Sequence, residues 1–387
     1  MKVKYFVLSD NNSKSGVSKK VSSQLSALVQ AGLNIELILV AVGNTHCGNL
    51  NNSKIYTLDK IPPKKIIRRI KRVRKINRIL DDIIKELNYN DILYLRGLSP
   101  FILNYPHNYL RIFRICRIVT EHQTFEREEY KLGNNFLSYI SDILFAKILR
   151  KNSDALVGVT DEITKYELVL SGNPDKLHIT IGNGFDVNSV LLRNPPQFTD
   201  DEIHILFVAT VFIWHGFDRL IYGLNNFTHN MNIYIHIVGD GPEILSLQKL
   251  TTELGLTKSV IFHGFRTGEE LDEFFNKCHI AVGSLGIHRK GLKQTSELKA
   301  REYCARGIPY IIACEDPDFP EDFPYIFRLP ADESPINIDE VIKFATKISE
   351  DKDHPKKMHQ YACDHLDWSI KMKKLKEFFE TLTETTG

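Results

Sequence analysis

The sequence predicts an α/β protein built from two Rossmann-like domains with parallel sheets, on three observations. First, the chain has 387 residues, which is longer than one hydrophobic core supports. Second, from about residue 203 onward, apolar β-branched runs alternate with Gly/polar loops and helical periods, the pattern of a parallel sheet covered on both faces. Third, the first half of the chain repeats this alternation less cleanly. Two domains of the same type therefore follow.

Each expected strand is a short apolar run bounded by polar or glycine residues. In the first half the expected strands are 2–9, 34–41, 91–95, 111–119, 154–159 and 177–182. In the second half they are 203–210, 232–239, 259–264, 279–284 and 308–314. The helices expected between the later strands are 217–227, 242–254, 269–277 and 295–306, with Pro242 as the first residue of its helix.

The seam between the domains is expected within residues 184–202, where Pro195 and Pro196 interrupt any helix and acidic residues cluster. We therefore assign residues 1–186 to the first domain and 187–364 to the second. The amphipathic C-terminal segment, about 365–387, is expected to pack back on the first domain.

Composition is that of an ordinary globular protein, with 25% charged residues and a formal net charge of +2. Six cysteines are widely scattered, without a CxxC pair or a zinc-ligand spacing, so we expect reduced thiols and no metal site. No uninterrupted apolar stretch reaches the roughly 20 residues of a membrane span. A cytoplasmic protein without a secretion signal is expected.

Ligands of such sheets gather at the carboxyl ends of the strands, so the loops that follow strands hold the first candidates. Gly16 lies just before an expected helix, where it suits either a phosphate-binding loop or a plain turn. The segment "GDGPE", with Gly239 and Gly241, is equally open to a nucleotide-binding or a structural interpretation. His122 and Arg96 each follow a strand, a position that favours a site, although a lone histidine is more often structural.

The stretch "GLKQTSELKAREYCARGIPYII" predicts a helix that Ser296 opens and Gly307 ends. Lys299 and Glu302 are three residues apart and share a helical face. They form either a salt bridge, or a cation for a phosphate beside a carboxylate for a ribose diol.

The loop within "VATVFIWHGFDRL" (208–220) has the strand–loop–helix order of an anion site, yet it contains no Lys or Arg before Gly216. It offers only Thr210, aromatic residues and His215.

Residues 64–78, "KKIIRRIKRVRKINR", contain nine basic residues and no acidic one, with apolar residues at helical spacing. This basic amphipathic helix favours binding to an anionic membrane surface. Nucleic acid is not expected as a partner because no recognised module accompanies the helix. A solvated surface helix stays open.

Several segments in register resemble glycosyltransferase family 4, whose GT-B fold has two Rossmann-like domains that face each other across a cleft. "SDALVGVTDEITKYEL", "KLHITIGNGFDV", "ILFVATVFIWHGFDRLI", "IVGDGPE", "VIFHGF", "EELDEFFNKCHIAVGS" and "REYCARGIPYI" follow in the family's order and spacing. The resemblance covers about residues 150–315 well and the first domain loosely.

The resemblance implies transfer of a sugar from a nucleotide-sugar, with UDP-sugars favoured, to a glycan or lipid-linked acceptor. It implies retention at the anomeric carbon, no metal and no cofactor, as in the assembly of capsule, O-antigen or lipopolysaccharide. A cytoplasmic enzyme peripheral to the cell membrane would suit this task.

The resemblance also implies roles for single residues. Glu302 would bind the ribose, His122 would lie near the transferred sugar, and Gly16 near the phosphates. The remaining nucleotide-binding candidates are Arg96, Gly239, Gly241, Gly264, Phe265 and Ser296.

Three departures from the family pattern are expected to matter. The first glutamate of E-x7-E falls at Gln294, and the diphosphate-binding Arg and Lys fall at Thr210 and His215. Charge-assisted hydrogen bonds are about twice as strong as neutral ones, so these losses need compensation. The candidate substitutes are Lys299 chiefly, a protonated His215, and the loop cations Arg289, Lys290 and Lys293.

Two interpretations follow. Either other cations replace the missing pair and the enzyme is active, or catalysis is lost and the chain serves as a partner subunit or sugar-binding scaffold. An epimerase or phosphorylase on the same fold is disfavoured.

Overall fold

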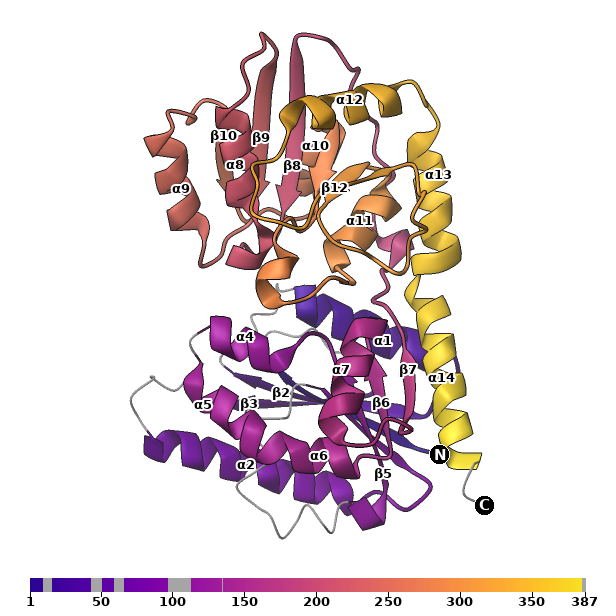
Figure 1. Ribbon diagram of the computed structural model, residues 1–387. Helices are drawn as coiled ribbons and strands as arrows, with labels where there is room; N and C mark the ends of the chain where they lie inside the picture. Colours follow the sequence, from indigo (N-terminus) through magenta and orange to yellow (C-terminus); the bar gives the residue numbers. More distant parts are fainter. Residues whose placement is uncertain (10–15, 43–50, 59–65, 97–112, 134, 385–387) are drawn as a thin grey trace. The chain divides into compact units, whose positions relative to one another are not determined.

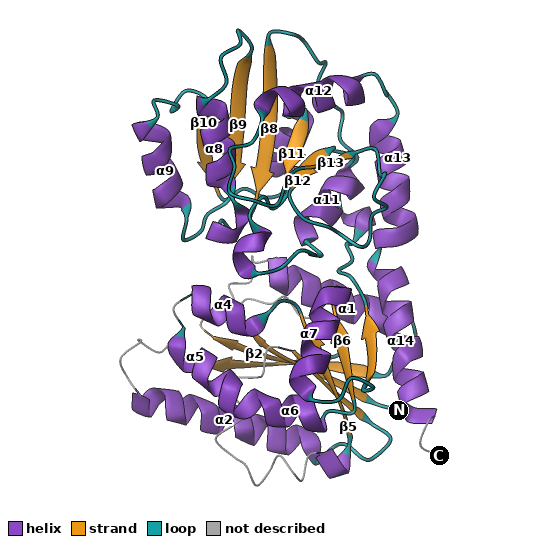
Figure 2. Ribbon diagram, in the orientation of Figure 1, coloured by secondary structure: helices purple, strands orange, loops and turns teal. Residues whose placement is uncertain are grey.

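The computed structural model describes residues 1–9, 16–42, 51–58, 66–96, 113–133 and 135–384 (Figure 1). Its residues form two compact units: unit 1 comprises 1–182 and 368–387, and unit 2 comprises 183–367. Helices and strands alternate in both, as the colouring by secondary structure shows (Figure 2). Each unit is described below by itself.

Unit 1 contains a seven-stranded parallel sheet with strand order β3-β2-β1-β4-β5-β6-β7. Its strands are β1 (Val3–Ser9), β2 (Ile35–Val42), β3 (Ser53–Leu58), β4 (Ile92–Arg96), β5 (Arg117–His122), β6 (Ala155–Gly158) and β7 (Leu177–Thr180). Its helices are α1 (Gly16–Gln30), α2 (Ile66–Ile84), α4 (Glu126–Leu132), α5 (Phe136–Ser141), the π-helix η2 (Asp142–Ala146), α6 (Lys147–Asn152), α7 (Asp161–Ser171) and α14 (Trp368–Glu384).

The two faces of this sheet are covered differently. α1 and α14 pack together on one face, where Tyr94 of β4 meets Phe379 of α14 (Figure 1). On the other face, Ile118 of β5 and Leu149 of α6 share a buried cluster with Ile76 and other residues of α2. Since side chains alternate along a strand, neighbouring residues of β5 serve opposite faces.

Unit 2 contains a six-stranded parallel sheet with strand order β10-β9-β8-β11-β12-β13. Its strands are β8 (Glu202–Val208), β9 (Asn232–Val238), β10 (Val260–Gly264), β11 (Ile280–Val282), β12 (Tyr310–Ile312) and β13 (Ile326–Arg328). Its helices are α8 (Phe217–Asn225), α9 (Ile244–Glu253), α10 (Glu269–Lys277), α11 (Leu298–Arg306), α12 (Ile338–Ser349) and α13 (His354–Tyr361), with the π-helix η6 (Ala362–Leu366) and the 3-10 turns η3 (Val187–Ser189), η4 (Ile213–His215) and η5 (Ile287–Lys290).

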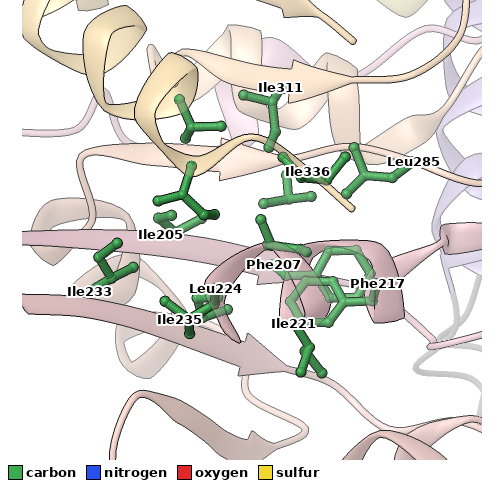
Figure 3. Close-up of a cluster of buried hydrophobic side chains, with 14 of the residues drawn as sticks. Ile205, Phe207, Phe217, Ile221, Leu224, Ile233, Ile235, Leu285, Ile311 and Ile336 are labelled. Carbon is green, nitrogen blue, oxygen red and sulfur yellow. The ribbon is translucent and has the colours of Figure 1, made fainter. Parts of the chain in front are cut away.

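One face of the second sheet forms the main core of unit 2 (Figure 3). Branched residues of β8 and β9, such as Ile205 and Ile235, pack there against Phe217 and Ile221 of α8. The period of two in these strands and the helical period in α8 place the apolar side chains of these three elements toward one another.

The other face of this sheet carries a row of histidines under α10. Nδ1 of His204 (β8) lies 2.8 Å from Nε2 of His236 (β9), and Nδ1 of His236 lies 2.9 Å from Nε2 of His263 (β10). Phe274 of α10 packs on the rings of His236 and His263. Burial, neighbouring Lys277 and the other two rings together lower the pKa of His236 to about 3, and burial also lowers the pKa of His204 and His263, so this row is neutral at pH 7.

The predicted two-domain α/β fold with parallel sheets is confirmed, while several predicted elements need correction. The strand expected at 111–119 begins only at Arg117, since residues 113–115 are helical. The edge strands β3 and β13 were not predicted, because β3, "SKIYTL", is half polar and β13, "IFR", has only three residues. The helix after "GDGPE" begins at Ile244, with Pro242 in the preceding turn.

Candidate functional site

Both sheets have the doubly wound order in which the chain reverses direction beside the first strand. In unit 2 this switch point lies between β8 and β11, and in unit 1 between β1 and β4. Loops leave the switch point on opposite sides, so the carboxyl ends of the two central strands form a natural ligand crevice. In unit 1 the residues after β1 and β4, 10–15 and 97–112, lie outside the described residues. The site can therefore be built in detail in unit 2.

Tyr303 of α11 connects the ends of β8 and β11. Its hydroxyl donates to the carbonyl of Val282 at 3.1 Å and accepts from the amide of Val208 at 3.2 Å. The side chain is fully buried. This contact fixes α11 against the switch point and brings Lys299, one helical turn earlier, to the carboxyl edge of the sheet.

Lys299 lies among polar and aromatic groups at this edge. Its Nζ donates to Ser284 Oγ at 3.3 Å, lies 3.7 Å from Glu297 Oε2, and sits 5.0 Å from the centre of the Phe207 ring. Burial lowers the pKa of Lys299, and Glu297 opposes that shift. A buried ammonium beside one carboxylate is suited to attract a second, more highly charged anion.

Glu297 is the carboxylate that sequence reasoning missed. One of its oxygens accepts from the backbone amide of Ser284 at 3.1 Å, and the other accepts from the Ser284 hydroxyl. Glu297, not Ser296, is the N-cap residue of α11. The prediction that Ser296 opens the helix was wrong, because its hydroxyl instead accepts from the backbone amide of Asn183 at 2.7 Å.

His215 is a neutral ring, contrary to the expectation that it assists as a cation. Burial, Lys299 and Lys290 each lower its pKa, which falls well below the ordinary value. Its Nδ1 also accepts from the backbone amide of Phe212 at 3.1 Å, a bond that protonation at Nδ1 would break. The ring remains at the edge of the sheet, where Nε2 carries the proton.

Lys290 is the second buried cation of this edge. Its Nζ lies 4.6 Å from the centre of the Trp214 ring, which in turn stacks on Phe212. Besides burial, Lys299 and Lys290 both lower the pKa of His215, and Lys290 lies over Trp214, so both lysines face the loop that follows β8. This loop contains no cation of its own.

Arg289 is paired with carboxylates outside this edge, so it is not a candidate for binding an anion at the loop after β8. Its guanidinium forms ion pairs with Asp218 at 2.8 Å and with Glu333 at 2.5 Å, and it also donates to the carbonyl of Ile213. Two carboxylates already neutralise it. The arginine therefore braces the loop after β8 against η5 and α8.

The glycines of "GDGPE" are explained by backbone packing. A Cβ on Gly239 would lie 1.9 Å from the carbonyl oxygen of Ala209, and one on Gly241 2.3 Å from that of Val211. The loops after β8 and β9 thus touch directly. At these two positions glycine is required to let the loop after β8 adopt its shape, whatever else binds there.

The other candidates of unit 2 lie around this edge. Glu302, on α11, accepts from Arg306 at 2.9 Å, and no ion pair between Glu302 and Lys299 is formed. Gln294 donates to Glu315 at 3.2 Å, and Lys293 is exposed beside it. Thr210, Gly264 and Phe265 are exposed at the ends of β8 and β10.

His122 ends β5 in unit 1 and is buried. Its Nε2 lies 2.9 Å from Thr120 Oγ1, and its Nδ1 lies 3.3 Å from Glu167 and 3.8 Å from Glu126. Burial lowers the pKa of His122 to about 4 although Glu126 opposes the shift. The ring is therefore neutral at pH 7, able to orient a hydroxyl but not to supply a positive charge.

Arg96 and Gly16 are the remaining candidates of unit 1. Arg96 ends β4. Burial lowers its pKa, but Glu121 and Tyr5 raise it by more, so the net shift is upward. Among the described residues, its Nη1 has no hydrogen-bond partner. Gly16 begins α1.

Neither a metal cluster nor a membrane span occurs in the part of the chain that the structure describes. No group of three or more His, Cys, Asp or Glu residues is arranged there to hold a metal ion. No described helix is long and apolar enough to cross a bilayer. The described cysteines, Cys116, Cys278, Cys304, Cys314 and Cys363, are free thiols.

Comparison with known proteins identifies the fold. Residues 191–313 match the family model of glycosyl transferases, group 1. The lipopolysaccharide outer core galactosyltransferase WaaB, in its apo form, is 14% identical with a TM-score of 0.65, over 98% of this chain and 99% of that one. Sucrose-phosphate synthase from Thermosynechococcus elongatus is 14% identical with a TM-score of 0.72, and all of both chains is covered.

Anabaena HepE, solved with UDP-glucose, is also 14% identical, with a TM-score of 0.65 over 98% of this chain and 100% of that one. No curated protein matches the sequence. These neighbours show that the chain has the GT-B fold.

Proposed function

We propose that this chain is a glycosyltransferase that moves a sugar from a nucleotide-sugar, with UDP-sugars favoured, to a glycan acceptor. The observation that carries the proposal is the pair of buried lysines, Lys299 and Lys290, at the switch point of unit 2. This edge belongs to the segment that matches group 1 glycosyl transferases. The complex of HepE with UDP-glucose supports the choice of donor.

The diphosphate of the donor would bind at the end of β8. Departure of the nucleotide leaves negative charge on the diphosphate oxygens, and preorganised donors in a buried site stabilise that charge. Lys299 and Lys290 would supply the cations that Thr210 and His215 do not, and the Nε2–H of His215 would add a neutral hydrogen bond. We propose that these lysines serve without a metal and that the anomeric configuration is retained.

Glu302 would bind the ribose hydroxyls, and residues near Phe265 would line the base. Arg306 already neutralises Glu302 in part, which orients its carboxylate. For His122 we propose an orienting role toward a sugar or acceptor hydroxyl, since the ring is neutral. Gly16, Arg96, Gln294, Lys293 and Ser296 stay weaker candidates for donor binding. Gly16, Gln294 and Ser296 rest on the family resemblance, Arg96 on its position after a strand, and Lys293 on its charge.

The acceptor is proposed to be a lipid-linked glycan of a surface polysaccharide, presented at the cytoplasmic leaflet. Support comes from α2, whose described basic residues Lys71, Arg74, Lys75 and Arg78 are all exposed. Each basic residue near an anionic surface contributes about 1 kcal/mol of attraction. Lys64 and Lys65 of the predicted helix lie outside the described residues.

A thermal-shift and hydrolysis screen of UDP-, GDP- and ADP-sugars tests the proposal. Stabilisation and slow hydrolysis by a UDP-sugar are expected, with activity that survives a chelator and a product of retained configuration by NMR. Stabilisation without hydrolysis or transfer would instead favour the sugar-binding scaffold. If no nucleotide-sugar stabilises the protein, the proposal fails.

A further inference from the structure

The helical stretch from α4 to α6 exposes its apolar side chains. Phe136 is 69% exposed and Leu144 59%, and three further large apolar residues within the same stretch are about 40% exposed. We call these five residues the apolar ridge: Leu132, Phe136, Ile143, Leu144 and Ile148. Positions 136, 143, 144 and 148 are all exposed, whereas 142, 146, 149 and 150 are buried, so the four lie on the solvent side of this stretch. Such a concentration of exposed apolar residues marks an interaction surface.

The opposite side of the same helices buries charges. Asp142 and Arg150 are almost fully buried, and Arg150 Nη1 donates to Asp142 Oδ1 at 2.9 Å. Arg150 also pairs with Glu167 of α7 at 2.5 Å, and Arg127 of α4 pairs with Asp142 at 2.5 Å. This network fixes which side faces inward. The helix cannot rotate to bury the ridge without leaving these charges unpaired.

The exposed charges on the α5–α6 part of the ridge are positive, whereas α4 also carries Glu128, which pairs with Lys131 at 3.6 Å. Between residues 131 and 152, the exposed charged residues are Lys131, Lys147 and Lys151, while Asp142 is buried. Helix α2 adds more cations on the neighbouring surface, because Leu149 of α6 shares a core cluster with Ile76 and Ile79 of α2. Apolar side chains bordered by lysines and arginines match the chemistry of an anionic bilayer surface.

We propose that the apolar ridge inserts into the interfacial layer of an anionic bilayer, while α2 and the three lysines contact the lipid headgroups. The inference deepens the proposed membrane location, and it adds an apolar contact that the basic helix alone does not provide. Binding through α2 weakens with salt, whereas burial of the ridge does not. The two contributions can therefore be separated.

Sedimentation of the full chain with vesicles tests the ridge. Vesicles of phosphatidylcholine alone or mixed with phosphatidylglycerol are compared at low and high salt. Wild type is expected to bind the mixed vesicles and to keep part of that binding at high salt. Phe136→Ser and Leu144→Ser should each weaken binding about tenfold at either salt concentration, since each removes one large apolar side chain from the contact.

Matched controls separate this effect from folding and charge. Val169→Ser changes an exposed residue of α7, 77% exposed and outside the ridge, and should bind as wild type. Arg74→Ala with Arg78→Ala should weaken binding at low salt only. Circular dichroism and Tm should be unchanged in all variants, because each changed side chain is exposed.

Ridge variants that bind vesicles as wild type does would overturn the inference. So would a wild-type dimer that the ridge variants convert to monomers, because the face would then bind a second copy. Donor hydrolysis in vesicle-free solution is measured in parallel and should be equal in wild type and ridge variants. If neither wild type nor the ridge variants hydrolyse any donor, while wild type still binds vesicles, the proposed function is refuted but the membrane role of the ridge is not.

Discussion

Lys299 Nζ lies 3.7 Å from Glu297 Oε2, and both side chains are anchored to Ser284 at the end of β11. The pair answers the question that the loop after β8 raises, namely which group neutralises an anion there. A cation on α11 reaches the switch point, and a carboxylate two residues earlier holds it in place. Lys299 is distant in sequence from the family's cation positions in the loop after β8, but it is close to that loop in space.

Replacing the carboxylate should change the titration of the lysine. Glu297 raises the pKa of Lys299 against the lowering effect of burial, so Glu297→Gln should lower that pKa. Donor binding that needs the protonated amine is lost as pH rises through the pKa, and the variant should lose it at lower pH. NMR titration of ¹³C-methylated lysines and the pH profile of donor affinity measure this. An unchanged alkaline limb in the variant would argue against the coupling.

The histidine row should make unit 2 sensitive to acid. The pKa of His236 is lowered from 6.5 to about 3, so the folded state binds fewer protons than the unfolded state below pH 6.5, and stability falls as pH falls. At pH 5 this one residue should reduce the free energy of unfolding by about 2 kcal/mol relative to pH 7.

Urea unfolding of wild type and His236→Gln at both pH values measures the difference. The variant should lose about 2 kcal/mol less between pH 7 and pH 5 than wild type does. His229→Gln, at an exposed loop position, serves as the control. The same acid sensitivity in wild type and His236→Gln would contradict the assignment.

Gly239 should tolerate no side chain. Gly239→Ala places a Cβ 1.9 Å from the Ala209 carbonyl, and the free energy of unfolding should fall by roughly 3–5 kcal/mol. Gly255→Ala is the matched control, because Gly255 also has positive φ but no neighbouring atom within 4 Å of a Cβ. The control should lose only about 1 kcal/mol. Equal losses in the two variants would mean that φ strain alone explains the glycine.

The central strands and the edge strands β7 and β10 were predictable, whereas the edge strands β3 and β13 were not, for a physical reason. The strands of unit 2 beside the switch point are largely buried and read as mostly apolar runs, such as Ile205 to Val208. β3 is half exposed, so its sequence "SKIYTL" lacks that signal. Residues 113–115 are apolar in part but helical, because the apolar pattern does not separate a short helix from a strand.

At the site, the sequence indicates which segments meet but not how their charges pair. Lys299 and His215 were both predicted as candidates, His215 from its place in the loop after β8 and Lys299 from the family resemblance of its helix. Arg289 was misjudged because its partners Asp218 and Glu333 are distant in sequence. Glu297 was missed for a similar reason, since its role depends on the amide of Ser284. Glu333 and Ser284 become recognisable only once the loops are folded together.

The affinity of Lys299→Ala for a UDP-sugar, measured by titration calorimetry against wild type, tests the central claim most directly. Lys249→Ala, an exposed lysine of α9 that pairs with Glu253, is the control and should bind as wild type. A hydrogen bond to a charged group contributes about 1.5–3 kcal/mol, so the account predicts binding roughly 10–100-fold weaker in Lys299→Ala with an unchanged fold. Wild-type affinity in Lys299→Ala would contradict it.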